Sequence, residues 1–194
     1  MDVLHLGPTN ATHVKQFSEI RLRALHTDPT AFDSSYEREL AFDDDEWRRR
    51  LASFAGHPGA VFAIFAAVDT PPEGPDATAA PPTTNEIAAV PVGIVGVGLP
   101  EPTDAIIWGM WVAPEGRRRG LAAQLLDNAE AWAAEAGAET AALWVHRSND
   151  RAQALYRRRS YEVVGPDDLP DDLPDDVAEA CCGEVCMRAR LAST

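Results

Sequence analysis

Lysine is nearly absent from this chain of 194 residues, whereas arginine is abundant. Lysine occurs once, at Lys15, and the 17 lysines and arginines are outnumbered by 31 aspartates and glutamates. The resulting net charge of −14 would repel a nucleic-acid backbone from most of the surface, so we expect no nucleic-acid partner. The same charge would attract a cationic partner, although acidity of this kind also simply favours solubility.

Cysteine is scarce as well, and its three positions crowd near the C-terminus: Cys181, Cys182 and Cys186. This spacing fits neither a disulfide framework nor paired zinc knuckles, so we expect reduced thiols and no metal site. Cys186 stands between Val185 and Met187 and is expected to be a strand or core residue rather than a nucleophile.

Long apolar runs are also missing. The longest, 60–68, is too short for a membrane helix, and the N-terminus lacks a basic region followed by an apolar one. We therefore expect no membrane partner and a cytoplasmic location. The length predicts a single domain spanning 1–194, and it leaves homodimerisation open.

The most informative segment that is present joins an apolar run at 105–113 to an amphipathic helical pattern. It consists of Arg117, Arg118, Arg119, Gly120, Leu121 and Ala122. A basic turn with a glycine before a helix N-terminus favours anions, because the first helical N–H groups lack intrahelical partners and the helix dipole adds positive charge. Alone, such a segment is more often an ordinary strand-to-helix turn with solvated arginines.

The surrounding motifs change this interpretation. They are Met110-Trp111-Val112-Ala113-Pro114 before the turn, then Leu143-Trp144-Val145, then Asn149, Ala152, Leu155 and Tyr156 at helical spacing. Together with the turn, these motifs resemble the GNAT superfamily of acetyl-CoA-dependent N-acetyltransferases. The resemblance covers the C-terminal half strongly and the rest in outline, and it does not specify the acceptor.

Periodicity and the resemblance together predict a mixed α/β (α+β) fold with a largely antiparallel seven-stranded central sheet flanked by about four helices. Strands are expected at 2–6, 60–68, 90–99, 105–113, 139–145, 161–165 and 183–191, and helices at 9–26, 43–54, 118–136 and 149–159. Segment 31–40 is expected to be irregular. A Pro/Ala/Thr-rich hairpin loop is expected at 70–85, and an acidic loop at 166–183.

The resemblance implies transfer of an acetyl group from acetyl-CoA to a primary amine, directly within a ternary complex. It implies that the turn Arg117–Ala122 binds the pyrophosphate and that the backbone of Met110, Trp111 and Val112 pairs with pantetheine at a strand bulge. A main-chain N–H of that bulge is then the expected oxyanion donor. Asn149 and Ala152 are expected to contact the cofactor arm.

By the same resemblance, Tyr156 contacts the cofactor and protonates the leaving thiolate as the catalytic acid; on spacing alone it would be a packing residue. Two positions depart from the family pattern. Ser160 stands where the family usually has glycine, so we expect either a strained backbone or a modified turn there, and Gly116 replaces a frequently larger residue.

The sequence leaves the general base open among Glu101, Asp104, Tyr36, Glu37 and a water chain. The acceptor is expected to be a small-molecule or peptide amine with further positive charge, attracted by Asp28, Asp33 and the aspartates at 167, 168, 171, 172, 175 and 176. Two other functions remain open: a CoA-binding sensor or inactive interaction domain, and a transferase that uses a longer acyl donor.

Overall fold

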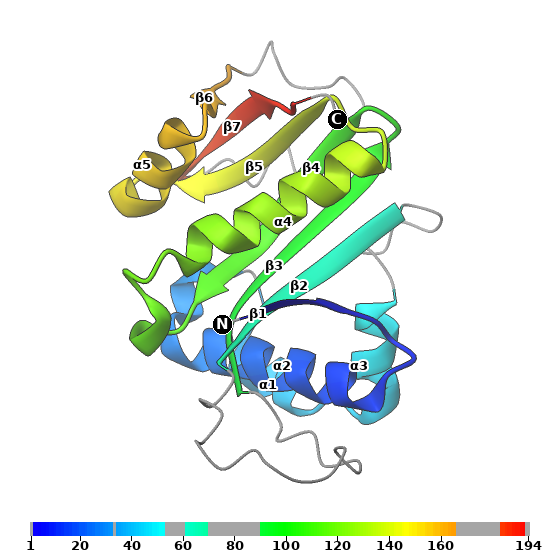
Figure 1. The fold of residues 1–194 in the computed structure, drawn as a ribbon. Helices are drawn as coiled ribbons and strands as arrows, with labels where there is room; N and C mark the ends of the chain where they lie inside the picture. Colours follow the sequence, from blue (N-terminus) through cyan, green and yellow to red (C-terminus); the bar gives the residue numbers. More distant parts are fainter. Residues whose placement is uncertain (1, 33, 53–60, 70–89, 166–182, 193–194) are drawn as a thin grey trace, which may run out of the picture.

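The computed structural model describes residues 2–32, 34–52, 61–69, 90–165 and 183–192. Figure 1 shows the arrangement of its helices and strands. In chain order these are β1 (Asp2–Leu6), α1 (Ala11–Thr27), η1 (Pro29–Ala31), α2 (Tyr36–Leu40), α3 (Asp44–Leu51), β2 (Val61–Asp69), β3 (Val90–Glu101), β4 (Asp104–Val112), η2 (Pro114–Gly116), α4 (Leu121–Glu135), β5 (Thr140–His146), α5 (Asp150–Arg158), β6 (Glu162–Val163) and β7 (Glu184–Arg190). The elements η1 and η2 are single 3₁₀ turns.

The seven strands form one sheet in the order β1-β2-β3-β4-β5-β7-β6. Every neighbouring pair is antiparallel except β4 and β5, which are parallel and joined through α4. The predicted fold class is therefore confirmed. The predicted hairpin is confirmed by the β2–β3 register, while its loop at 70–85 and the acidic loop at 166–182 lie outside the described residues.

The helix starts follow local capping chemistry. Asn10 Oδ1 accepts hydrogen bonds from the N–H groups of Thr12 and His13, and Asp43 Oδ1 accepts one from the N–H of Glu46. The helix expected at 118–136 begins only at Leu121, because the backbone before it includes residues with positive φ.

The expectation that 31–40 is irregular was wrong for its second half, which forms α2. Ser35 caps this short helix through its hydroxyl, which accepts from the N–H of Arg38. The helix is stabilised by a tertiary contact that no periodicity shows. Its Glu39 is fully buried and accepts hydrogen bonds from Nε and Nη2 of Arg21 in α1 at 3.0 and 2.9 Å.

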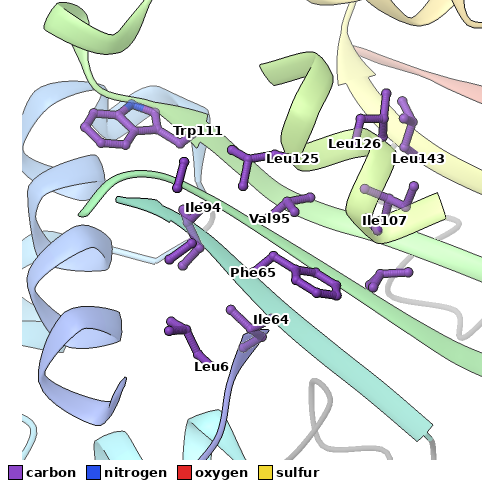
Figure 2. Packing of buried hydrophobic residues seen from close by; sticks show 14 of the residues in the cluster. Leu6, Ile64, Phe65, Ile94, Val95, Ile107, Trp111, Leu125, Leu126 and Leu143 are labelled. Carbon is purple, nitrogen blue, oxygen red and sulfur yellow. The ribbon is translucent and has the colours of Figure 1, made fainter. Parts of the chain in front are cut away.

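The core lies around β3, whose residues from Pro91 to Leu99 are all buried. Because successive side chains of a strand point to opposite faces, β3 is covered on both faces, and both α1 and α4 contact it. Figure 2 shows Val95 of β3 among Leu125 and Leu126 of α4 and Phe65 of β2. As predicted, Cys186 is a buried strand residue in β7.

Glycine at position 96 is required by close packing of an aromatic ring. A Cβ at Gly96 would lie 2.4 Å from Cε2 of Trp108, which pairs with it across β3 and β4. The Trp108 indole thus packs directly on the backbone of β3.

We therefore expect Gly96→Ala to lower the free energy of unfolding by about 1–3 kcal/mol, because the added methyl group overpacks this contact. Urea denaturation would measure the change. Gly7→Ala is the matched control, since a Cβ there meets nothing within 4 Å, and it should change stability much less. Equal effects of the two substitutions would contradict the packing argument.

Candidate functional site

Strand β4 contains one extra residue next to its C-terminal end. Ile94 of β3 pairs with Trp111, and Gly96, two residues further along β3, pairs with Trp108. The two pairs are therefore three residues apart on β4 but only two residues apart on β3. Gly109 within this bulge has φ +61°, a conformation that suits glycine. The bulge turns the end of the strand away from the regular ladder.

Beyond the bulge, β4 and β5 separate. Their parallel pairing begins at Asp104 and Thr140 and ends at Ile107 and Leu143. Among the described residues, no strand pairs with the β5 side of Met110, Trp111 and Val112, so this backbone edge is available to an extended ligand. The structure thus brings these three predicted residues to an open strand edge.

The turn after β4 presents an uncapped helix N-terminus. Gly120 is the N-cap of α4 with φ +80°, and no side chain caps the helix there. The first helical hydrogen bond is donated by the N–H of Gln124 to the carbonyl of Gly120, so the preceding N–H groups, including those of Leu121 and Ala122, have no partner within the helix. A Cβ at Gly120 would meet no atom within 4 Å, which leaves the approach to these groups open.

Gly116 in this connection, where the family often has a larger residue, has a packing reason. A Cβ there would lie 3.0 Å from Cδ1 of Leu121 and 3.2 Å from Cγ1 of Val112. The turn between β4 and α4 is therefore compact, and it places the α4 N-terminus directly after the open edge of β4.

The three arginines of the turn differ in their surroundings. Arg117 donates from Nε to the carbonyl of Val112 at 2.9 Å and from Nη2 to Asp28 Oδ2 at 2.7 Å. Arg118 and Arg119 are exposed, and Arg118 has φ +61°. Arg117 thus braces the turn, whereas the other two side chains extend from its surface.

Asp28 was expected beside the acceptor, but its carboxylate contacts the protein itself. Besides Arg117, its Oδ2 accepts a hydrogen bond from Trp111 Nε1 at 2.6 Å. The Asp28 and Arg117 side chains remain 37% and 43% exposed, so their ion pair contributes only roughly 0–1 kcal/mol to stability. Asp33 and the six loop aspartates lie outside the described residues.

On the other side of the opening, α5 begins at the predicted Asn149. The Asn149 side chain caps the helix by accepting from the N–H of Ala152 at 3.1 Å. Gln153, which sequence reasoning missed, is buried, and its Nε2 donates to the carbonyls of His146 and Arg147 at 3.3 and 2.8 Å. Gln153 therefore fixes the β5–α5 connection, and only its burial, which no sequence pattern shows, marks it.

Tyr156 is 6% exposed, on the side of α5 that faces the core. Burial raises its pKa to about 12, because the ionised phenolate would lose its hydration. Its ring lies 5.9 Å from that of Tyr161, centroid to centroid. Burial and the nearby Glu130 carboxylate also raise the pKa of Tyr161.

Ser160, between α5 and Tyr161, has φ +64°, which confirms the expected backbone strain. The reversal of the chain at this point lets the N–H of Tyr161 donate to the carbonyl of Tyr156 at 3.1 Å. A serine is thus held in the conformation that the family's glycine adopts more easily.

Two candidates for the general base lie far from this opening. Glu101 of β3 and Asp104 of β4 are opposite each other in the strand register, at the N-terminal end of β4. At 3.3 Å per residue, Asp104 lies about 26 Å from Val112. Partial burial of the Asp104 carboxyl opposes ionisation, but hydrogen bonding from Thr140 and the charge of Arg188 outweigh it and hold its pKa below the usual range. A carboxylate stabilised in this way is a weak base.

The other two candidates, Tyr36 and Glu37, line a pocket of about 380 Å³ at the C-terminal end of α1. Its lining also contains the rings of His26 and Phe32. Arg21 lies over the Phe32 ring, 4.6 Å from its centroid, while it binds the buried Glu39. This salt bridge therefore holds Arg21 against Phe32, one of the lining residues. Neither the pocket nor the salt bridge could be predicted from the sequence.

Within the described residues, no group of three His, Cys, Asp or Glu side chains could hold a metal ion. In the same part of the chain, no helix has both the length and the apolar character to cross a membrane.

An uncapped helix N-terminus after an opened strand edge is an arrangement that suits an extended ligand with an anionic end. Comparison with known proteins identifies the family. The chain belongs to the Acetyltransferase (GNAT) family, whose sequence pattern matches residues 22–161, well over half of it. The family and fold are those of an acyltransferase.

Solved structures with a similar fold extend over nearly the whole chain. An acetyltransferase of the GNAT family from Staphylococcus aureus Mu50 is 12% identical, with a TM-score of 0.65 over 98% of this chain and 99% of that chain. Aminoglycoside 6'-acetyltransferase type Ii is 18% identical, with a TM-score of 0.61 over 100% and 99%. NAA60 of Arabidopsis thaliana, in complex with a bisubstrate analogue, is 14% identical, with a TM-score of 0.59 over the same shares. No curated protein sequence matches the chain significantly.

The burial of Tyr156 predicts a loss of stability at alkaline pH. An unfolded tyrosine ionises near pH 10 and folded Tyr156 only near 12, so between these values the unfolded state has released the proton that the folded state keeps. Stability therefore falls as pH rises through this window, by up to about 1.4 kcal/mol per pH unit from this residue. Urea denaturation from pH 8 to 11 should show a shallower decline for Tyr156→Phe than for the wild type. Parallel declines would contradict the assignment.

Proposed function

We propose that this protein is an N-acetyltransferase that moves the acetyl group of acetyl-CoA directly to a primary amine while both substrates are bound. The observation that carries the proposal is the uncapped, glycine-led N-terminus of α4 next to the open edge of β4. A pyrophosphate fits the helix N-terminus, and an extended arm that contains amides fits the strand edge beside it. Coenzyme A has this chemistry, and a similar structure of aminoglycoside 6'-N-acetyltransferase is a complex with coenzyme A.

The turn would bind the pyrophosphate mainly through main-chain N–H groups of Leu121 and Ala122, with the helix dipole adding to the attraction. Arg118 and Arg119 extend from the same turn and add positive charge. Arg117 acts differently in this proposal: its contacts to Val112 and Asp28 hold the turn in shape.

The open backbone of Met110, Trp111 and Val112 would pair with the amides of pantetheine, as an added strand pairs with a sheet edge. One main-chain N–H from this segment would stabilise the thioester oxygen as it gains negative charge. Asn149 and Ala152 would flank the arm from α5, where the Asn149 amide nitrogen has no hydrogen bond to another described residue.

Tyr156 would act at the sulfur. A thiol has a pKa near 8.5, so complete proton transfer from a tyrosine with a pKa of about 12 to a thiolate is uphill by roughly 5 kcal/mol. A hydrogen bond to the sulfur as it becomes negative carries no such cost. We therefore assign Tyr156 the role of hydrogen-bond donor to the leaving thiolate, which receives its final proton in step with deprotonation of the amine.

The acceptor would enter from the pocket at the C-terminal end of α1, which we call the acceptor side. Tyr36 and Glu37 line this pocket and remain candidates for the general base, together with a water chain. We propose a small-molecule or peptide amine that carries further positive charge. Support comes from the Glu37 carboxylate, from rings that attract cations, and from the net charge of −14. Asp28 no longer supports this proposal, because Arg117 neutralises it.

Measuring release of CoA with a panel of cationic and neutral amines would separate the alternatives. Turnover of acetyl-CoA with a primary amine supports the proposal. Binding of CoA without turnover of any acyl donor would favour a sensor or an interaction domain, and turnover only with longer acyl chains would favour a different donor.

Gly120→Asp should lower the affinity for CoA by on the order of tenfold or more, because it places a carboxylate beside the pyrophosphate. Gly120→Asn is the matched control: it has the same size, tolerates positive φ, and lacks the charge. Calorimetry should show a much smaller loss for Asn than for Asp. Equal affinities of the two folded variants would remove the anion site from this turn.

Tyr156→Phe should lower kcat by on the order of 10²-fold while leaving CoA affinity nearly unchanged, because it deletes one hydrogen-bond donor and little apolar area. Steady-state kinetics and calorimetry would measure the two quantities. If Tyr156 only packs against Tyr161, kcat will stay near the wild-type value.

A further inference from the structure

Asp28 lies at a junction of three segments that are distant in sequence. Its backbone ends α1, where its N–H donates to the carbonyl of Ala24 at 2.9 Å, and its carbonyl accepts from the N–H of Ala31 in η1 at 3.0 Å. The carboxylate then reaches β4 through Trp111 and the α4 turn through Arg117. The Asp28 side chain thus connects the acceptor side to the open edge of β4 and to the turn before α4, which are the two parts of the proposed donor site.

The contact with Trp111 is well defined. Trp111 is 6% exposed, and its Nε1 donates to Asp28 Oδ2 at 2.6 Å. An indole N–H that is buried without an acceptor is unfavourable, so the carboxylate determines how the ring is oriented. Figure 2 shows Trp111 at the margin of the core, beside the N-terminal helices. Because Trp111 directly follows the bulge, its side chain fixes the direction of the open edge Met110–Val112.

Arg117 completes the junction. It donates from Nη2 to Asp28 and from Nε to the carbonyl of Val112. Arg117 thereby connects the turn before α4 both to the end of α1 and to the end of β4. The guanidinium presents these two donors in a fixed geometry. Removal of the Asp28 charge would leave Arg117 with one of its two contacts.

A second ion pair connects the same parts of the molecule but not the same strand edge. Arg23 Nη2 lies 2.5 Å from Glu115 Oε1, between α1 and η2. Both side chains are exposed to a degree similar to Asp28 and Arg117. This pair therefore provides a control for electrostatic attachment of α1 that does not involve Trp111. The Glu115 carboxylate also interacts with the charge of Arg117, so the comparison isolates the contact between Asp28 and Trp111.

We propose that Asp28 is a positioning residue that sets the geometry of the donor site from the acceptor side. It acts through Trp111 on the open edge of β4 and through Arg117 on the turn before α4. The inference rests on the proposed acetyltransferase function, and it removes Asp28 from the carboxylates that contact the acceptor amine.

The experiment compares Asp28→Ala, Trp111→Phe, the double variant and Glu115→Gln. Alanine removes the acceptor of both Trp111 and Arg117, and phenylalanine keeps apolar packing but lacks the indole N–H. We expect each single change at 28 or 111 to lower kcat/KM for acetyl-CoA by on the order of tenfold, with melting temperatures lowered by only a few degrees. We expect the double variant to lie within about twofold of the worse single one, because both changes interrupt one contact chain. Glu115→Gln should stay within twofold of the wild type.

A readout independent of turnover separates this inference from the proposed function. Amide hydrogen exchange should accelerate at Met110–Val112 in Asp28→Ala and not in Glu115→Gln, whether or not any amine is acetylated. Additive losses in the double variant, equal effects of Asp28→Ala and Glu115→Gln, or unchanged exchange at Met110–Val112 would each overturn the positioning role. Accelerated exchange together with no binding of CoA by the wild type would leave the positioning role standing and would instead overturn the proposed function.

Discussion

The extra residue in β4 is the constraint on which the site depends. A strand that continued regularly past Ile107 would pair with β5 to its end, and the backbone of Met110–Val112 would have no open side. The bulge at Gly109 separates the two strands while β3 keeps its pairing with β4 on the other side. The sheet thus stays continuous through the core, where β3 is buried on both faces. Strands β4 and β5 separate only at the end where an extended ligand could pair with the edge of β4.

Where two strands of a sheet separate, other contacts must hold them in position. In this protein charged side chains make these contacts. Glu39, fully buried, joins α1, α2 and α3 through Arg21 and Arg50, and Asp28 joins the end of α1 to β4 and the α4 turn. Burial opposes ionisation of Glu39, but hydrogen bonding and the charge of Arg21 lower its pKa. The acidic side chains of the N-terminal part therefore hold its helices together and attach them to β4 as well as adding to the net charge.

Sequence reasoning was most successful where a pattern has a direct local cause. The position of Cys186, the seven-stranded sheet and the strained backbone at Ser160 followed from composition, periodicity or the family resemblance. Sequence reasoning failed where contacts between residues distant in sequence determine the structure. Helix α2 depends on a salt bridge between Arg21 and Glu39, and Asp28 is engaged by residues 83 and 89 positions away, which no local signal indicates. Asp104 is a different case, because its position at the start of β4 already places it a strand length away from Val112.

The near absence of lysine has a structural counterpart in how the arginines are used. Arg21 donates through Nε and Nη2 to both oxygens of Glu39, Arg117 divides the same two donors between Val112 and Asp28, and Arg188 divides them between Thr140 and Asp104. In each case one planar side chain makes two directed contacts, which a lysine ammonium on a flexible stem does not reproduce. These three arginines therefore connect segments that are distant in sequence. Conservation of charge alone, as in a lysine substitution at Arg117, would preserve attraction to Asp28 and lose the second contact that shapes the turn.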